Sequence, residues 1–393
     1  MMREIIQTPG APKPLAHYCQ GVLAGETLYA AGQIASDYKT GVPAGPDIRK
    51  QARYILENLQ KVFQAAGCDF EDVVKSQVFM IDLKGLHQFD QVWKEFFPTP
   101  PPRTTMQVSG LLVPGCKVEI DLWGTRPLVT KTHHSQGILV GNTLYAAGQI
   151  ASEDNAGVAA GACQDPAFPY YGSNIQKQAR YVLNNLLGVF KAAGCDFKDV
   201  VKSQVFLTDL NDFCYFDQVW KEFFPSPPPR TTVQVSGLLV PGCKVEIDLW
   251  GVQPKIEKRI ITGKSTPTPM AHYCQGVLAG ETLYAAGQIA SDYKTGVPLE
   301  ARQDPVFPYY GSDIQKQTRY ILKNLSEVYA TAGCRLSDTV KAQVFLTDLN
   351  DFYYFDQVWK EFFPSPPPRT TVQISGLLVP GCRVEIDLTA ITP

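Results

Sequence analysis

The stretch TLYAAGQIAS at Thr27–Ser36 recurs letter for letter at Thr143–Ser152 and Thr282–Ser291. A second motif, PPPRTT, also occurs three times, and SGLLVPGC follows shortly after it each time. Such a fixed self-similarity identifies the folding unit. At about 130 residues, this unit has the size of a single domain rather than of a solenoid repeat. We therefore expect three copies of one domain, over residues 1–124, 125–251 and 252–393.

Composition and charge argue against several classes of protein. The apolar fraction of 45% and the charged fraction of 19% are typical of a globular protein. A formal net charge of −2 provides no overall attraction to nucleic acid or to an anionic membrane. The sequence contains neither a long uncharged apolar run nor a secretory signal at its start. The ten cysteines form no CxxC pair, and we expect free thiols in a reducing cytoplasm.

Hydrophobic periodicity in the first copy predicts the element order β-β-α-β-α-β-β. Apolar residues at helical spacing, with an Asp before them and Gly67 after them, predict a helix over Asp47–Ala66. A second amphipathic helix ends at Pro98, because proline cannot continue a helix. The second helix is expected at Leu86–Phe97. The strands are expected at Gly21–Ala24, Thr27–Ile34, Val73–Leu83, Thr104–Val108 and Lys117–Trp123.

This order predicts an α+β domain with both helices on one face of its sheet. The other face must also be covered, because the alternation in KVEIDLW does not suit a solvated surface. Val118, Ile120 and Leu122 should point to one face, and Glu119 and Asp121 to the other. The simplest cover is the equivalent sheet of the other copies, arranged around a pseudo-threefold axis.

Few groups suited to anion binding or proton transfer recur in all three copies. Arg103 follows a rigid proline run, and its planar guanidinium suits a carboxylate. Glu119 lies on a sheet face near an expected interface, where burial would raise its pKa and allow it to handle protons. Gly32, at a strand end, would allow a ligand to approach the backbone closely. Their equivalents are Arg230 and Arg369, Glu246 and Glu385, and Gly148 and Gly287.

We expect Arg103 and Glu119 to lie on strands that could pair. The same residues also have plainer interpretations. The repeated arginine and glutamate could form an interdomain salt bridge, and the glycine could mark an ordinary bulge. The Trp and Phe of QVWKEFF are interpreted as helix core. No spacing typical of a metal site, a phosphate loop or a nucleophilic serine is present, so the residues alone indicate an anion-binding arginine beside a carboxylate.

The repeated segments resemble the RidA/YjgF family. PPRTTMQVSGLLVPGCKVEID resembles the C-terminal motif of that family, and HYCQG is similar to its P-Y-S-Q-A/G segment. LYAAGQIA resembles the family strand that ends in S-G-Q, and NLQKVFQAAGCDFEDVVKSQVFMIDL resembles a helix and strand of the family. The resemblance covers essentially all of each copy. It implies chorismate-mutase-like domains that form trimers, with sheets around a central barrel, helices outside and ligand clefts between subunits.

In this chain the trimer would be covalent, and we expect a monomer that acts as a pseudo-trimer. The resemblance implies hydrolytic deamination of enamine or imine carboxylates, such as 2-aminoacrylate, 2-iminopropanoate or an aminomuconate-like intermediate. The products would be a 2-oxo acid and ammonia, and the reaction would need no cofactor or metal. The expected partner is a small carboxylate, with no role for nucleic acid or membrane.

The resemblance also implies roles for the recurring residues. The three arginines would bind the substrate carboxylate, the three glutamates would direct water, and the backbone of the three glycines would help to hold the ligand. The tyrosine of the family segment corresponds to Tyr18 and Tyr273, whereas the second copy has His134 there.

Two features depart from the family pattern. The R-S-C of many members is R-T-T here, with Thr105, Thr232 and Thr371 in place of the cysteine. Copies two and three also carry insertions, Gln164–Ser173 and Gln303–Ser312, which either narrow a cleft or pack on the surface. Two other functions stay open, a non-catalytic metabolite-sensing or chaperone-like role and, with less support, an endoribonuclease.

Overall fold

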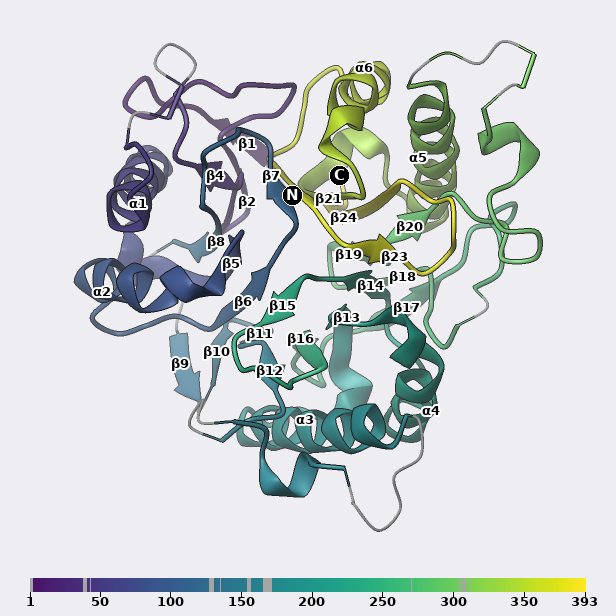
Figure 1. Cartoon of the computed structure of the whole chain (residues 1–393), viewed down its shortest axis with the longest axis horizontal. Coiled ribbons are helices and arrows are strands. Elements are labelled where there is room, and N and C mark those ends of the chain that lie inside the picture. The colour runs from purple at the N-terminus through teal and green to yellow at the C-terminus, as the bar shows by residue number, and fades with distance from the viewer. Residues whose placement is uncertain are drawn as a thin grey trace.

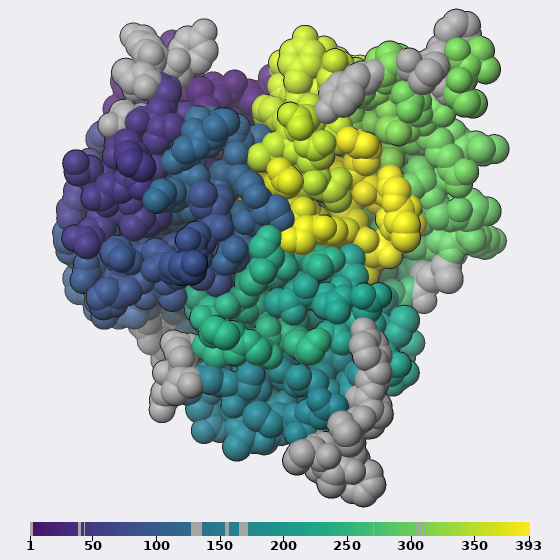
Figure 2. Space-filling model, in the orientation of Figure 1, coloured from purple at the N-terminus to yellow at the C-terminus, as the bar shows by residue number. Residues whose placement is uncertain are grey.

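The computed structural model consists of three similar domains arranged around a common centre (Figure 1). In the space-filling view they form three lobes that meet in the middle of the face shown (Figure 2). The structure describes residues 3–37, 41–42, 44–126, 136–153, 157–164, 172–269, 271–303, 305–306, 309 and 311–393, together with the backbone of 131–134.

The first domain confirms the predicted order of elements and adds short strands to it. Asp47 begins the first helix, where its side chain accepts a hydrogen bond of 2.8 Å from the backbone N–H of Arg49. Its elements are β1 (Arg3–Ile6), β2 (Gly21–Ala24), β3 (Thr27–Ala30), β4 (Gln33–Ile34), α1 (Ile48–Ala65), β5 (Val73–Met80), α2 (Leu86–Phe96), β6 (Arg103–Gln107), β7 (Gly110–Leu111) and β8 (Val118–Thr125).

The other two domains repeat this order. The second contains β9 (Lys131–His134), β10 (Gly137–Val140), β11 (Thr143–Ala146), β12 (Gln149–Ile150), α3 (Ser173–Ala192), β13 (Val200–Leu207), α4 (Phe213–Phe223), β14 (Arg230–Gln234), β15 (Gly237–Leu238) and β16 (Val245–Val252). The third contains β17 (Lys258–Ile261), β18 (Gly276–Ala279), β19 (Thr282–Ala285), β20 (Gln288–Ile289), α5 (Ser312–Ala332), β21 (Thr339–Leu346), α6 (Phe352–Phe362), β22 (Arg369–Gln373), β23 (Gly376–Leu377) and β24 (Val384–Ile391).

The order of strands corrects one expectation. The first sheet runs β1-β2-β3-β8-β5-β6-β15, so β5 lies between the strand of Glu119 and the strand of Arg103. β5 pairs antiparallel with β8 and parallel with β6. The prediction that the Arg103 and Glu119 strands could pair is therefore wrong. The crossover through α2 returns the chain parallel to β5, on the side away from β8.

Each sheet is completed by a short strand from another domain. β15 of the second domain pairs with β6, β23 of the third pairs with β14, and β7 of the first pairs with β22. This exchange is cyclic, so every domain both gives a strand and receives one. It covers edges that would otherwise leave backbone groups unpaired.

The inner faces of the three sheets meet in a buried polar layer. Lys341 donates hydrogen bonds to Asp121 of the first domain at 2.6 Å and to the carbonyl of Ala30 at 2.7 Å. Lys75–Asp248 and Lys202–Asp387 repeat this ion pair between the other domains. Next to these pairs, three glutamine side chains form a closed ring of hydrogen bonds of 2.6–2.7 Å, made by Gln77, Gln204 and Gln343.

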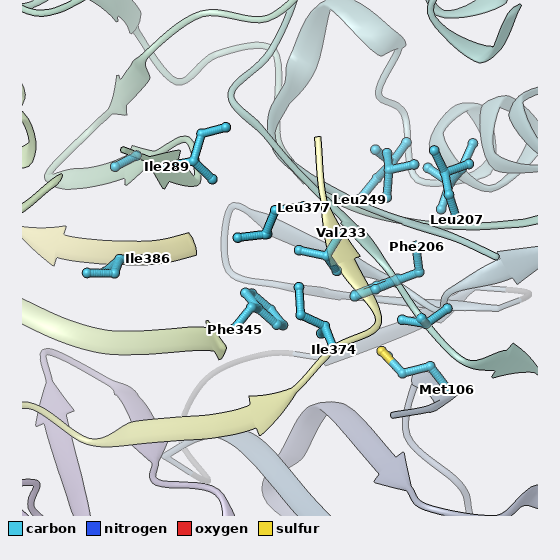
Figure 3. Packing of buried hydrophobic residues seen from close by; sticks show 14 of the residues in the cluster. Met106, Phe206, Leu207, Val233, Leu249, Ile289, Phe345, Ile374, Leu377 and Ile386 are labelled. Carbon is cyan, nitrogen blue, oxygen red and sulfur yellow. The ribbon is translucent and has the colours of Figure 1, made fainter. Parts of the chain in front are cut away.

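An apolar layer continues the contact between the domains. Met106, Phe206, Val233, Phe345 and Ile374 come from all three domains and are buried together (Figure 3). On the opposite face of the first sheet, Val118, Ile120 and Leu122 pack in one cluster with residues of α1 and α2. The expected alternation of β8 and the expected cover by neighbouring sheets are both confirmed.

The buried ion pairs give a first testable prediction. Lys341→Met would leave the Asp121 carboxylate buried without its cation, which we expect to lower the free energy of unfolding by about 3–5 kcal/mol. Adding Asp121→Asn removes the stranded charge and should recover part of the loss. Urea denaturation measures both variants. Arg53→Ala, which breaks an exposed pair with Glu95, is the control and should cost less than about 1 kcal/mol. Equal losses for Lys341→Met and Arg53→Ala would contradict the prediction.

The cyclic exchange of edge strands gives a second prediction, for the oligomeric state. Because a single chain supplies every strand of the exchange, we expect the protein to be a monomer. Light scattering should give the mass of one chain over a wide range of concentration. A stable assembly of three chains would contradict a covalent pseudo-trimer.

Candidate functional site

The recurring arginines and glutamates meet at the boundaries between domains, not within one copy. Each buried glutamate interacts electrostatically with the arginine of another domain, which identifies three related sites. The first site joins Glu119 to Arg369, the second joins Glu246 to Arg103, and the third joins Glu385 to Arg230.

Each glutamate is held by the backbone of the neighbouring domain and lies against a glycine of its own. The carboxylate of Glu119 accepts a hydrogen bond from the backbone N–H of Thr371. A Cβ atom on Gly32 would overlap Oε1 of Glu119, so only glycine allows this approach. The backbone N–H groups of Thr105 and Thr232 donate to Glu246 and Glu385 in the same way. Gly148 and Gly287 lie against those glutamates.

The N–H groups of these glycines are already bonded. Gly32 donates to Oγ1 of Thr370 at 3.1 Å, Gly148 to Thr104 at 3.1 Å and Gly287 to Thr231 at 3.0 Å. Any backbone contact from these glycines to a ligand would therefore have to use the carbonyl oxygen. The three threonines precede those that hold the glutamates, so both threonines of RTT position the site.

Burial changes the protonation of the glutamates. It raises the pKa of Glu119, Glu246 and Glu385 to about 8, and the neighbouring Asp121, Asp248 and Asp387 add to the rise by repulsion. Oε2 of Glu119 and Oε2 of Glu246 are buried without a hydrogen-bond partner. A buried carboxyl with a free oxygen and a pKa near neutrality is suited to exchange protons with a bound molecule.

Each arginine pairs with an aspartate of its own domain, which differs from the interdomain salt bridge considered above. Arg369 donates to Asp356 on α6 at 2.9 Å, and Arg230 donates to Asp217 on α4 at 2.8 Å. Arg103 lies 2.8 Å from Asp90 on α2. The sequence reasoning missed these aspartates, although the FDQVW that contains them recurs in every copy.

The guanidinium groups keep free donors within these pairs. Nη1 of Arg230 and both Nε and Nη1 of Arg369 are buried without a hydrogen-bond partner. Buried polar groups are almost always paired, so these free donors mark a candidate binding position at the domain boundary. Aromatic rings flank both groups. Arg230 lies over Phe213, Phe216, Trp220 and Tyr273, and Arg369 lies over Phe352, Phe355, Trp359 and Tyr18.

The predicted tyrosines belong to the first and third sites. Burial raises the pKa of both Tyr18 and Tyr273 to about 12, so their hydroxyls stay protonated at neutral pH. The Tyr273 hydroxyl lies 2.7 Å from that of Tyr293, which sequence reasoning missed. SDYKT occurs in the first and third copies and SEDNA in the second, which was the available signal. The side chain of His134 lies outside the described residues.

The third site opens into a cavity of about 590 Å³ between the second and third domains. Its lining includes Arg230, Thr232, Tyr273, Gly287 and Glu385. The residues proposed from sequence for this site therefore share one cavity.

The described part of the third-domain insertion contacts its own domain. The Tyr309 hydroxyl donates to Gln315 on α5 at 2.5 Å, and Gly311 lies against the ring of Tyr354 on α6. Gly172 lies against Tyr215 on α4 in the same way. Tyr170, Tyr171 and Tyr310 lie outside the described residues.

Two further observations concern the described residues as a whole. No helix among them is long and apolar enough to pass through a lipid bilayer. No three or more of their His, Cys, Asp and Glu side chains are grouped to hold a metal ion.

Comparison with known proteins accounts for nearly the whole chain. A family sequence profile described as Endoribonuclease L-PSP matches residues 8–126, 124–253 and 263–392. A RutC family protein of Saccharolobus solfataricus is 43% identical over 28% of this chain and 88% of that protein. The human 2-iminobutanoate/2-iminopropanoate deaminase is 33% identical over 31% of this chain and 88% of that protein. A solved chorismatase, 11% identical, covers 81% of this chain and 93% of its own with a TM-score of 0.55, which shows a likeness of fold alone.

The raised pKa of the glutamates links them to stability. The ordinary pKa is 4.5 and the folded value about 8, so the folded state binds these protons more tightly. Their stabilising effect is complete below the ordinary pKa and is lost as pH rises through about 8. In a Glu119/Glu246/Glu385→Gln variant these three side chains stay uncharged at every pH. Between about pH 6 and about pH 9 its free energy of unfolding should fall less than the parent's, by about 1–3 kcal/mol per site.

Urea denaturation at the two pH values measures this difference. The matched control is Glu95/Glu222/Glu361→Gln, which changes equivalent exposed glutamates that pair with Arg53, Arg180 and Arg319. If the parent and the buried-site variant lost the same free energy, the buried glutamates would not be protonated near neutrality.

Proposed function

The chain belongs to the RidA family through all three of its domains, and on this basis we propose that it is a hydrolytic deaminase of 2-imino carboxylates and their enamine tautomers. The products are a 2-oxo acid and ammonia. The observation that supports the proposal is the meeting, at each domain boundary, of an arginine of one domain with a buried glutamate of raised pKa from another. Relatives named as 2-iminobutanoate/2-iminopropanoate deaminases support it at the level of the family.

The arginine binds and orients the substrate. Arg369 has two buried nitrogen atoms, Nε and Nη1, without partners, and either can donate a charge-assisted hydrogen bond to a substrate carboxylate. The third nitrogen, Nη2, donates to Asp356 at 2.9 Å and fixes the guanidinium. The substrate carboxylate thus meets a cation whose position is fixed before binding, which reduces the entropy lost on binding.

The glutamate carries protons in both directions. Its protonated carboxyl donates to the imine nitrogen while water adds to the imine carbon, and the carboxylate then accepts a proton from that water. The carbinolamine collapses by the same exchange: the carboxyl protonates the amino group, the C–N bond breaks, and the hydroxyl proton returns to the glutamate as the carbonyl forms. One imino acid and one water give one 2-oxo acid and one ammonia. A carboxyl of pKa about 8 suits both steps near neutral pH.

An endoribonuclease, the activity named in the family description, fits these sites less well. The Arg230 side chain is only 1% exposed and is enclosed by aromatic rings. Such a site can admit one small carboxylate but not the repeated phosphates of a polynucleotide. The formal net charge of −2 also provides no attraction to RNA.

The test is the release of ammonia and 2-oxo acid from 2-aminoacrylate generated enzymatically from serine. The parent should accelerate both above the spontaneous rate. Replacing all three glutamates by Gln should lower the acceleration at least about 100-fold, because proton transfer in the transition state is lost. Arg103/Arg230/Arg369→Ala should raise KM strongly through loss of the carboxylate contact.

The matched control is Arg53/Arg180/Arg319→Ala, which removes the same number of arginines at equivalent exposed positions. This control should retain the activity of the parent. No acceleration by the parent on any 2-imino acid would remove the deaminase proposal. Ligand binding that survives in the Gln variants of a protein without turnover would favour a metabolite-sensing role instead.

A further inference from the structure

The three sites share their reacting groups but differ in their surroundings. The side chains of Arg230 and Arg369 are each 1% exposed, whereas that of Arg103 is 21% exposed. Phe213, beside Arg230, corresponds to Leu86 of the first domain, and Tyr273 of the third domain corresponds to His134 of the second. A tandem chain can therefore contain sites of different selectivity.

The third site has room for more than a small imino acid. Its cavity of about 590 Å³ lies within the range of about 300–1,000 Å³ that accommodates drug-sized ligands. An imino acid derived from alanine carries only a methyl group beyond its reacting atoms, so it would leave much of this space unfilled.

The lining of that space is apolar on both sides of the domain boundary. The second domain contributes Phe213, and the third contributes Ile289, Leu378 and Val379. Lys221 also lines the cavity, but its Nζ lies 3.1 Å from Asp217. An apolar side chain gains free energy from burial in such a lining, whereas a second carboxylate would have to compete with Asp217 for Lys221.

The aromatic wall of the cavity is rigid. Tyr293 has a positive φ of 59°, which is uncommon for a residue other than glycine. Ser291 Oγ accepts a hydrogen bond of 2.9 Å from its N–H, and the adjacent turn is fixed by bonds from Lys294 and Thr295 to Asp292. The hydroxyl contact with Tyr273 ties this turn to the segment before β18 of the same domain. The second copy has neither tyrosine, with His134 and Asp154 at the two positions.

We propose that the third site is selective for 2-imino acids with a large apolar side chain, of the size of the side chain of phenylalanine. The Arg230 guanidinium binds the carboxylate, Glu385 acts at the imine group, and the side chain occupies the space lined by Leu378 and Val379. The selectivity rests on the proposed deaminase function, but it can be tested through binding alone.

Cys214 provides the probe for that binding test. Its thiol is exposed and lines the cavity, whereas the exposed Cys163 is not part of the lining. Alkylation of the two thiols by iodoacetamide can be followed in the same sample by mass spectrometry. Phenylpyruvate is the product from the phenylalanine-derived imine. It should slow alkylation of Cys214 as much as pyruvate does at a concentration about tenfold or more lower. Neither acid should change the alkylation of Cys163.

Two variants sharpen this measurement. Leu378→Trp fills the apolar space and should reduce the preference for phenylpyruvate over pyruvate to within about twofold. Arg230→Ala should remove protection by both acids. Equal protection by phenylpyruvate and pyruvate, or stronger protection by a dicarboxylate of similar length, would overturn the inference.

Turnover separates failure of this inference from failure of the proposed function. In a Glu119→Gln/Glu246→Gln chain only the third site keeps its glutamate. With 2-imino acids generated by an amino-acid oxidase, its kcat/KM should be about tenfold or more higher for the phenylalanine-derived imine than for the alanine-derived imine. A parent that is active and a single-site chain that prefers the alanine-derived imine would refute the selectivity alone. A parent inactive on every imine, with selective protection of Cys214 intact, would refute the deaminase function alone.

Discussion

The structure depends on a hydrogen-bonded junction built around one threonine at each domain boundary. Oγ1 of Thr370 donates to Asp121 at 2.7 Å and accepts from Lys341 at 3.1 Å and from the N–H of Gly32 at 3.1 Å. Thr370 therefore connects the buried Lys341–Asp121 ion pair to Gly32, which lies beside Glu119. The residues on either side of it complete the site, because Arg369 precedes it and the N–H of Thr371 binds Glu119. Three consecutive residues thus supply the guanidinium of the candidate site, connect the domains and hold the carboxyl of the neighbouring domain.

This junction explains why the glutamate can be buried and still keep an oxygen without a hydrogen-bond partner. Most buried carboxylates are paired with a cation, and pairing lowers their pKa. Here the lysine of the junction contacts Asp121, so Glu119 lies beside a satisfied ion pair and keeps one oxygen without a partner. The result is a raised pKa in a rigid environment, which is the combination that proton transfer near neutrality needs. The network that stabilises the assembly also sets the chemistry of the site.

Much of the fold could be predicted from the sequence, because its signals are local. The repeats reveal the domain, and the alternation of β8 correctly places Asp121 at the interface with other domains. The partner of each arginine could not be predicted, because it depends on the insertion of β5 between β8 and β6 and on the packing of separate copies. Asp356 and Tyr293 could have been identified as candidates, because their motifs recur. Their roles follow from side-chain contacts with Arg369 and Tyr273, which periodicity does not reveal.

Next to the buried lysines, the three domains differ at one equivalent position, which identical subunits could not do. Lys341 and Lys75 each lie 5.0 Å from an indole ring, of Trp123 and Trp250, but the corresponding residue of the third domain is Thr389. Thr389 lines a gap of about 20 Å³, enough for a single water molecule. In an assembly of identical subunits, one codon change would delete all three indoles from the axis at once. In this fused chain the same change removes only one, so each copy can vary at the axis independently of the other two.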